Sequence, residues 1–194
     1  MRLAKNIEDI GASSLAIKDM AGLLRPKTAY TLIKKLKKNL NIPIHLHTHS
    51  TTGLADATNF KAFEAGVDNI DTSISSFSNL YAHTATESMI AMMYDNRSSP
   101  FNNELLTEIS NYFENIRKNY SKYEGSMKGI DVKMLTNQVP GGMLSILEKQ
   151  LVDLKKQHKL MDLIKEIPRI RKDVGYIPLV TPTSQIVGAQ ALSN

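Results

Sequence analysis

The chain has 194 residues, enough for a domain with a substantial hydrophobic core, and its composition is 42% hydrophobic and 22% charged, as is usual for globular proteins. No apolar run approaches the roughly 20 residues that span a bilayer, and the N-terminus lacks a signal-peptide layout, so we expect a cytoplasmic protein. The chain has no cysteine. That fits a reducing compartment and excludes thiolate ligands from any metal site.

A net charge of +5 raises the question of a polyanionic partner. The densest basic cluster, residues 34–38, lies in a segment whose apolar residues repeat at helical spacing (Ala29, Leu32, Ile33, Leu36 and Leu40). The lysines therefore belong on the solvated side of an amphipathic helix, and no aromatic residues alternate with them to stack on bases. We expect no nucleic-acid partner.

The first third of the chain alternates between helical and strand patterns. Helices are expected at residues 3–10, 27–40 and 56–65, and strands at 14–19, 42–49 and 69–75. This alternation predicts parallel β/α units, and therefore an α/β fold. Polar residues collect where each strand ends, which is where a β/α barrel places its active site.

After residue 75 the pattern becomes mostly helical. Helices are expected at residues 84–96, 104–123, 143–158 and 160–171, and Thr84 and Glu87 have the spacing of a capping box. The Gly pair at 141–142 precedes one of these helices and can expose backbone amides at its N-terminus. We expect this helical region to pack onto or beside the β/α part.

Three histidines alternate along the second strand, and His45, His47 and His49 therefore point to one face. Neighbours in this series have Cα atoms about 6.6 Å apart, whereas His45 and His49 are about 13 Å apart. One ion with bonds of about 2.0–2.1 Å to nitrogen is therefore shared by neighbours. If the strand belongs to a barrel, the pair nearest its carboxyl end is His47 and His49. A hydrogen-bonded core role is the usual alternative for a single histidine, but the His-x-His spacing favours a metal site.

Two further positions have a possible catalytic role and, for each, a purely structural alternative. Lys18 ends a strand, where burial would favour a neutral amine that can act as a nucleophile, form a Schiff base or trap carbon dioxide; the alternative is a Lys18–Asp19 ion pair in a solvated loop. The loop at 180–185 brings hydroxyl groups together around Pro182. It either caps the following helix or holds a hydroxyl over a site.

Four separated stretches together resemble the carboxyltransferase component of biotin-dependent enzymes. They are residues 17–24 (IKDMAGLL), 45–49 (HLHTH), 138–145 (QVPGGMLS) and 179–188 (LVTPTSQIVG). This family includes the oxaloacetate decarboxylase alpha subunit, the carboxyltransferase part of pyruvate carboxylase and the methylmalonyl-CoA transcarboxylase subunit that acts on pyruvate. The last two stretches look most like the decarboxylase alpha subunit or a two-subunit pyruvate carboxylase.

The resemblance implies a TIM-type barrel in which Lys18, as a carbamate, joins His47, His49 and an aspartate around a divalent metal, usually zinc; the first-strand motif that supplies this aspartate has no counterpart in this sequence. It also implies that Thr181 is catalytic and contacts biotin, passing a proton between biotin and the methyl carbon of the substrate. Oxaloacetate and pyruvate are the implied substrates. Biotin would come from a carrier domain or subunit outside this chain, and the complete enzyme is expected to be a homo-oligomer.

The sequence also departs from the family pattern. Only three of the eight barrel strands are recognised, so residues 1–98 are expected to form the C-terminal part of a barrel and residues 99–194 a helical carboxyltransferase region. A missing N-terminal barrel half is then a partner, and the isolated fragment should be inactive. Ser50 stands where relatives mostly carry Asp, and residues 79–83 replace a Gly-Gly-Thr-Ser-Gln loop.

Two other readings remain. One is a metal-dependent lyase or condensing enzyme on a related barrel, which also uses a His-x-His pair; the settings of Lys18 and Thr181 argue against it. The other is a non-catalytic partial barrel that needs its missing half.

Overall fold

The computed structural model describes residues 1–94, 99–125, 127–137 and 139–194. Three expectations fall partly outside these ranges: the end of the helix predicted at 84–96, the domain boundary at residue 98, and Gln138 in the third family stretch.

A small parallel sheet lies in the first part of the chain. Its strands are β1 (Leu15–Asp19), β2 (Ile44–Thr48) and β3 (Asn69–Ile70), in the order β1-β2-β3. In the register of the sheet Lys18 lies opposite His47, and His45 lies opposite Asn69. The α/β class and the parallel β/α units predicted from the sequence are confirmed.

The third strand is much shorter than the predicted 69–75. The last bond to β2 runs from the Asp71 N–H to the Leu46 carbonyl at 2.9 Å, and the Ser73 N–H then donates to the Thr84 carbonyl at 3.0 Å. Ser73 forms an isolated bridge with Ala85, and a 3₁₀ turn, η1 (Ser75–Phe77), follows. The predicted strand therefore changes partner after two residues.

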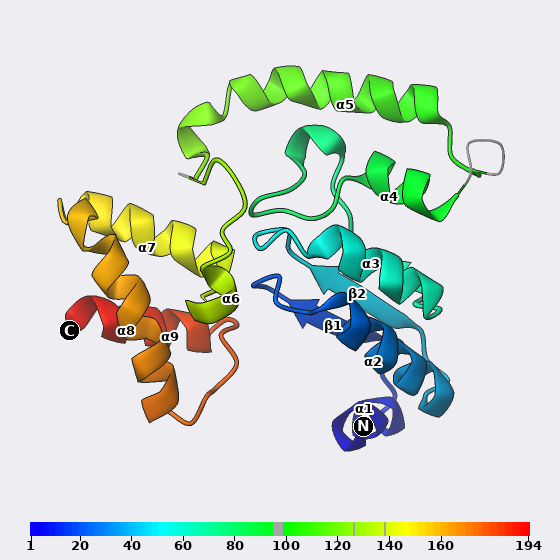
Figure 1. The fold of residues 1–194 in the computed structure, drawn as a ribbon, viewed down its shortest axis with the longest axis horizontal. Helices are drawn as coiled ribbons and strands as arrows, with labels where there is room; N and C mark the ends of the chain where they lie inside the picture. Colours follow the sequence, from blue (N-terminus) through cyan, green and yellow to red (C-terminus); the bar gives the residue numbers. More distant parts are fainter. Residues whose placement is uncertain (95–98, 126, 138) are drawn as a thin grey trace.

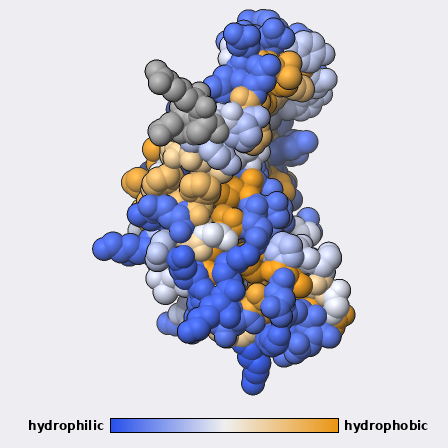
Figure 2. Space-filling view, turned by 90° about the vertical axis from the view of Figure 1, so that its right-hand side faces the viewer, coloured by the Kyte–Doolittle hydropathy of each residue, from blue (hydrophilic) through white to orange (hydrophobic). Residues whose placement is uncertain are grey.

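Helices alternate with these strands: α1 (Arg2–Asp9), α2 (Pro26–Asn39) and α3 (Ala55–Glu64). Helix α2 has Pro26 at its first residue, where the missing N–H costs nothing. Its lysines are exposed, as predicted, and the lower part of Figure 2, where α1 and α2 lie, is mostly hydrophilic.

The hydrophobic core of this part lies on one face of the sheet. Ile44 and Leu46 of β2 are fully buried and pack with Ile33 and Leu36 of α2 and Ala62 of α3. Because side chains alternate along a strand, His45 and His47 point to the opposite face of β2. The helices therefore cover one face, and the histidines occupy the other.

Helices dominate the rest of the described chain. They are α4 (Thr86–Met93), α5 (Asn103–Lys118), α6 (Met134–Asn137), α7 (Gly141–Asp153), α8 (Leu160–Asp173) and α9 (Thr183–Ser193), with 3₁₀ turns η2 (Ser121–Tyr123) and η3 (Gln157–Lys159). The strand arrows in Figure 1 point toward the side where α6 to α9 lie. In the described residues no helix is long and apolar enough to cross a membrane.

The capping box predicted for Thr84 and Glu87 is wrong. Helix α4 begins at Thr86, and the Thr84 hydroxyl instead accepts a hydrogen bond from Asn59 Nδ2 at 2.9 Å. The Glu87 carboxylate accepts from the Ser75 N–H and hydroxyl. Both side chains are therefore engaged by other elements.

A second hydrophobic cluster joins α6 to α9. Its buried members are Met134, Val139, Met143, Leu147, Leu151, Leu163, Ile167, Ile170, Leu179, Val187 and Ala191. It has no buried residue in common with the cluster of the β/α part, within the residues that the structure describes.

Candidate metal centre

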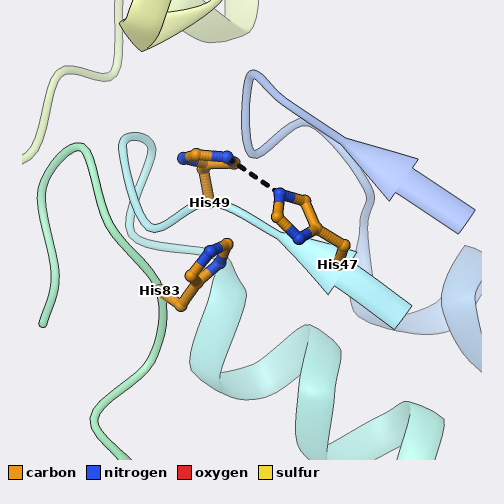
Figure 3. Close-up of side chains that lie close together, drawn as sticks. All are labelled: His47, His49 and His83. Carbon is orange, nitrogen blue, oxygen red and sulfur yellow. Dashed lines mark hydrogen bonds between the residues drawn. The ribbon is translucent and has the colours of Figure 1, made fainter. Parts of the chain in front are cut away.

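Three histidines converge beyond the carboxyl end of β2. His47 lies on β2, His49 in the loop directly after it, and His83 in the segment between η1 and α4 (Figure 3). The Nε2 atoms of His47 and His49 are 3.2 Å apart. The His83 ring centroid lies 4.4 Å from that of His47 and 4.7 Å from that of His49. One nitrogen from each of the three rings lies within 4.8 Å of the other two.

Asp71, which follows β3, bridges two of the strand histidines. Its carboxylate oxygens lie 2.6 Å from His45 Nε2 and 2.6 Å from His47 Nδ1. Burial raises the pKa of Asp71, but the hydrogen bonds from His47 and His45 outweigh it and hold that pKa below its ordinary value. Asp71 is therefore a carboxylate that fixes the His47 ring, and it links His45 to the histidine pair.

The hydrogen bonds of His47 and His49 suit metal ligands. Each ring uses Nδ1 on an acceptor, the carboxylate of Asp71 for His47 and the Tyr81 carbonyl, at 2.5 Å, for His49. In the neutral form each Nε2 then carries a lone pair, and the two lone pairs face each other. Two nitrogens bound to one tetrahedral ion with bonds of about 2.0–2.1 Å lie about 3.3 Å apart, close to the observed separation. The residues therefore fit a shared divalent ion.

The electrostatics of His49 agree with this reading. Burial lowers its pKa; the hydrogen bond to the Tyr81 carbonyl opposes that shift, while the neighbouring His83 and His47 reinforce it. The net effect is a pKa below the ordinary value, which favours the neutral imidazole that metals bind.

Lys18 lies on the neighbouring strand, in register with His47 and on the same face of the sheet. It is exposed, so the burial that was expected to favour a neutral amine is not found. The alternative role of Lys18, an ion pair with Asp19 in a solvated loop, does not agree with the contacts of Asp19. Its carboxylate accepts from the Leu23 and Leu24 N–H groups at 2.9 and 2.8 Å and from the Thr48 hydroxyl at 2.8 Å. Asp19 thus shapes the loop after β1 and ties it to β2.

The structure shows why residue 22, in the same stretch as Lys18, is a glycine. Its φ is +65°, and a Cβ atom at this position would lie 2.4 Å from the His49 carbonyl oxygen. Only glycine permits both the backbone conformation and the close approach. The loop after β1 therefore packs directly against the backbone of His49.

Thr181 lies in the turn before α9 and is exposed. The peptide bond to Pro182 is cis. The Thr183 hydroxyl donates to the Val180 carbonyl at 2.7 Å. Among the described residues no hydrogen bond joins Thr181 to a histidine of the centre. The structure thus brings His47 and His49 together, places Lys18 beside them, and leaves Thr181 in a separate loop.

Two residues of the centre, Asp71 and His83, were not identified from the sequence. Asp71 lies among the polar residues at the end of the third predicted strand, and the sequence alone assigns it no role. His83 has no spacing relation to the other histidines, and no pattern in the sequence indicates it.

Comparison with known proteins identifies the family. Residues 1–112 match the HMGL-like family model, and residues 134–194 match the conserved carboxylase domain. The chain is 44% identical, over its whole length, to a pyruvate carboxylase subunit of Methanocaldococcus jannaschii, of which it covers 35%. It is 43% identical, also over its whole length, to the methylmalonyl-CoA carboxyltransferase 5S subunit of Propionibacterium freudenreichii subsp. shermanii, of which it covers 39%.

Comparison with solved structures agrees with the sequence comparisons. The carboxyl transferase domain from Rhizobium etli pyruvate carboxylase matches 99% of this chain with a TM-score of 0.93 and 33% identity, and the match covers 32% of that structure. The chain thus spans a little over a third of the two curated relatives described above. The match over residues 1–112 shows that the chain belongs to the HMGL-like family, and its relatives described above are carboxylase and carboxyltransferase subunits.

Proposed function

We propose that this chain is the metal-holding part of a carboxyltransferase that moves carboxylate between oxaloacetate or pyruvate and biotin. In this proposal the chain is part of a subunit similar in function to an oxaloacetate decarboxylase alpha subunit or a pyruvate carboxylase subunit. The observation that carries the proposal is the pair of Nε2 atoms of His47 and His49, 3.2 Å apart, each on a ring whose Nδ1 is used by another acceptor.

We also infer a partial TIM-type barrel. Residues 1–98 would form its last three strands and residues 99–194 the helical carboxyltransferase region, with an N-terminal barrel half as partner. Support comes from three parallel strands with histidines on the face that the helices leave free. Two family models match separately, to residues 1–112 and 134–194, which supports two parts; the first match extends beyond the proposed boundary at residue 98. Cytoplasmic location and homo-oligomeric assembly stay predictions from the sequence.

In this proposal the residues around the metal have different roles. Nε2 of His47 and His49 would hold the ion, and Asp71 keeps the His47 ring in place. The amine of Lys18, once deprotonated, would add carbon dioxide and release a proton, which yields an anionic oxygen ligand on the same face. A divalent ion, for which we propose zinc, would supply polarisation of the keto oxygen and stabilisation of the enolate.

The Thr181 hydroxyl is the proposed proton relay between the biotin nitrogen and the substrate methyl carbon. A hydroxyl can accept one proton while donating another and so carries no charge. The loss of such a relay typically costs about 10²–10⁴-fold in rate, whereas loss of a helix cap costs about 1 kcal/mol of stability.

A chimera tests the proposal. This chain replaces the matched stretch of the Methanocaldococcus jannaschii subunit, and carboxyl transfer from oxaloacetate to biotin is measured together with metal content. We expect the chimera to be active, and His47→Ala to lose both metal and activity. Thr181→Ala should abolish transfer while metal content and Tm stay unchanged, and Thr181→Ser should keep part of the activity. Normal turnover with early melting of Thr181→Ala would make Thr181 a structural residue.

A further inference from the structure

The loop that carries His83 is tied to the segment after β2. The Ser50 N–H donates to the Ala82 carbonyl at 2.8 Å, and the Thr51 hydroxyl donates to the Leu80 carbonyl at 3.1 Å. Within the loop, the Asn79 N–H donates to the His83 carbonyl at 2.7 Å. These contacts join the loop to the residues that flank His49, so they hold His83 beside the metal pair.

Backbone conformation in this loop is also unusual. Asn79 and Leu80 have φ values of +64° and +50°. Leucine rarely adopts this region, and such residues persist only where surrounding contacts enforce them. The loop therefore maintains a costly conformation next to the histidines.

His83 repeats the hydrogen-bonding pattern of the other two rings. Its Nδ1 lies 2.8 Å from the Thr48 carbonyl, which only accepts, so Nδ1 carries the hydrogen in the neutral ring. The Nδ1 of His47 and that of His49 are used in the same way, on Asp71 and on Tyr81. All three rings are thus left with Nε2 as a lone-pair atom. This is the arrangement that orients metal-ligating histidines.

We propose that His83 is a third imidazole ligand, so that this chain binds a divalent ion through His47, His49 and His83. The inference rests on the proposed metal function of the His47–His49 pair and adds a residue to it. One ring nitrogen of each histidine lies within 4.8 Å of one nitrogen in each of the other two rings, against about 3.3 Å for ligands of one tetrahedral ion. Ion binding is therefore expected to draw the three rings together.

The alternative is that His83 only packs against the other rings and holds the loop through Thr48. Asparagine separates these roles, since its side-chain amide can still donate to the Thr48 carbonyl but has no atom at the position of Nε2. His158, which lies exposed in η3, provides the matched control because its replacement removes a histidine remote from the cluster in sequence.

The test is titration of the 194-residue chain with Zn²⁺ by calorimetry and with Co²⁺ by visible absorption. His83→Asn should weaken Zn²⁺ binding by more than about 100-fold, beyond the 10–100-fold cost of losing a residue that only orients a ligand. It should also change the Co²⁺ spectrum, while His158→Ala leaves both unchanged.

Other outcomes separate the two proposals. If His47→Ala and His49→Ala lose Zn²⁺ but His83→Asn binds as well as His158→Ala, the inference is overturned and the proposed function stands. If the unmodified chain binds neither ion, both fail. Nitrogen-15 NMR of the histidine rings needs no substitution and guards against misfolding of the variant. Zn²⁺ should shift three Nε2 resonances, and a shift of only two would refute the role of His83.

Discussion

At the scale of single residues, the Asp71 carboxylate sets the orientation and the tautomer of the His47 ring. Its two oxygens accept from His45 and His47, so both rings are fixed by one side chain. Carboxylate partners of this kind set the tautomer and orientation of a ligating histidine. Asp71 therefore belongs to the centre although it would not touch the ion.

Replacement of Asp71 by asparagine should weaken Zn²⁺ binding about 10–100-fold. An amide offers an acceptor oxygen to only one of the two rings and turns N–H donors toward the other, so one ring must change tautomer or rotate. Calorimetric titration of the variant measures the effect, with far-UV circular dichroism to show that the fold is kept. Unchanged affinity would mean that the backbone alone orients His47.

Gly22→Ala should destabilise the chain more than Gly66→Ala. Both glycines have positive φ, +65° and +86°, so both alanines carry the backbone strain of about 1 kcal/mol. Only at Gly22 does the added Cβ meet a carbonyl oxygen, that of His49, at 2.4 Å; at Gly66 nothing lies within 4 Å. Urea unfolding of the two variants gives the comparison. An equal decrease in the free energy of unfolding for both variants would show that the loop after β1 can shift to accommodate the added Cβ without loss of stability.

The sequence predicts the metal pair but not the residues around it. His47 and His49 share a face because strand geometry places alternate residues together, and this needs no tertiary information. Asp71 reaches them only because β3 pairs with β2, and His83 only because its loop bonds to the residues after β2. Contacts of this kind depend on chain pairing, which local patterns do not encode.

At the scale of elements, Asp68 joins α2 to the beginning of β2. Its carboxylate accepts from the Ile44 N–H at 2.7 Å and from Lys37 Nζ at 2.7 Å. The Ile44 N–H and then Lys37 hold the pKa of Asp68 below its ordinary 3.8. A lowered folded-state pKa gives stability above the unfolded value, and this stability is lost as the pH falls through the folded value.

Asp68→Asn should therefore lower the free energy of unfolding at neutral pH by about 1 kcal/mol, a modest value because a third of the side chain is exposed. The difference between the variant and the wild type should shrink as the pH falls below 3.8. Urea unfolding across this range checks it. A difference that persists at acid pH would assign the effect to shape rather than charge.

Elements differ in how well local pattern predicts them. Helix α2 follows from the periodic burial of Ala29, Ile33 and Leu36 and from Pro26 at its start. The capping box failed because Asn59, buried on α3, takes the Thr84 hydroxyl. A buried amide needs a partner, and this need overrides a local capping preference.

At the scale of the whole molecule, the chain has two hydrophobic centres. One lies between the sheet and its helices and includes Leu46; the other joins α6 to α9 and includes Ile167. Backbone contacts connect the two parts, such as the Asp131 N–H that donates to the Thr51 carbonyl at 2.9 Å. Such links transmit less stability than a shared core, because each centre buries its apolar surface independently.

We therefore expect two unfolding steps in calorimetry, each sensitive to its own core. Leu46 and Ile167 are both fully buried, and replacement of either by alanine should cost about 2–5 kcal/mol. Leu46→Ala should lower the transition of the β/α part and, since β2 carries His47, should weaken Zn²⁺ binding as well. Ile167→Ala should lower the other transition and leave Zn²⁺ affinity unchanged. A single transition that both variants lower equally would show that the two centres fold as one unit.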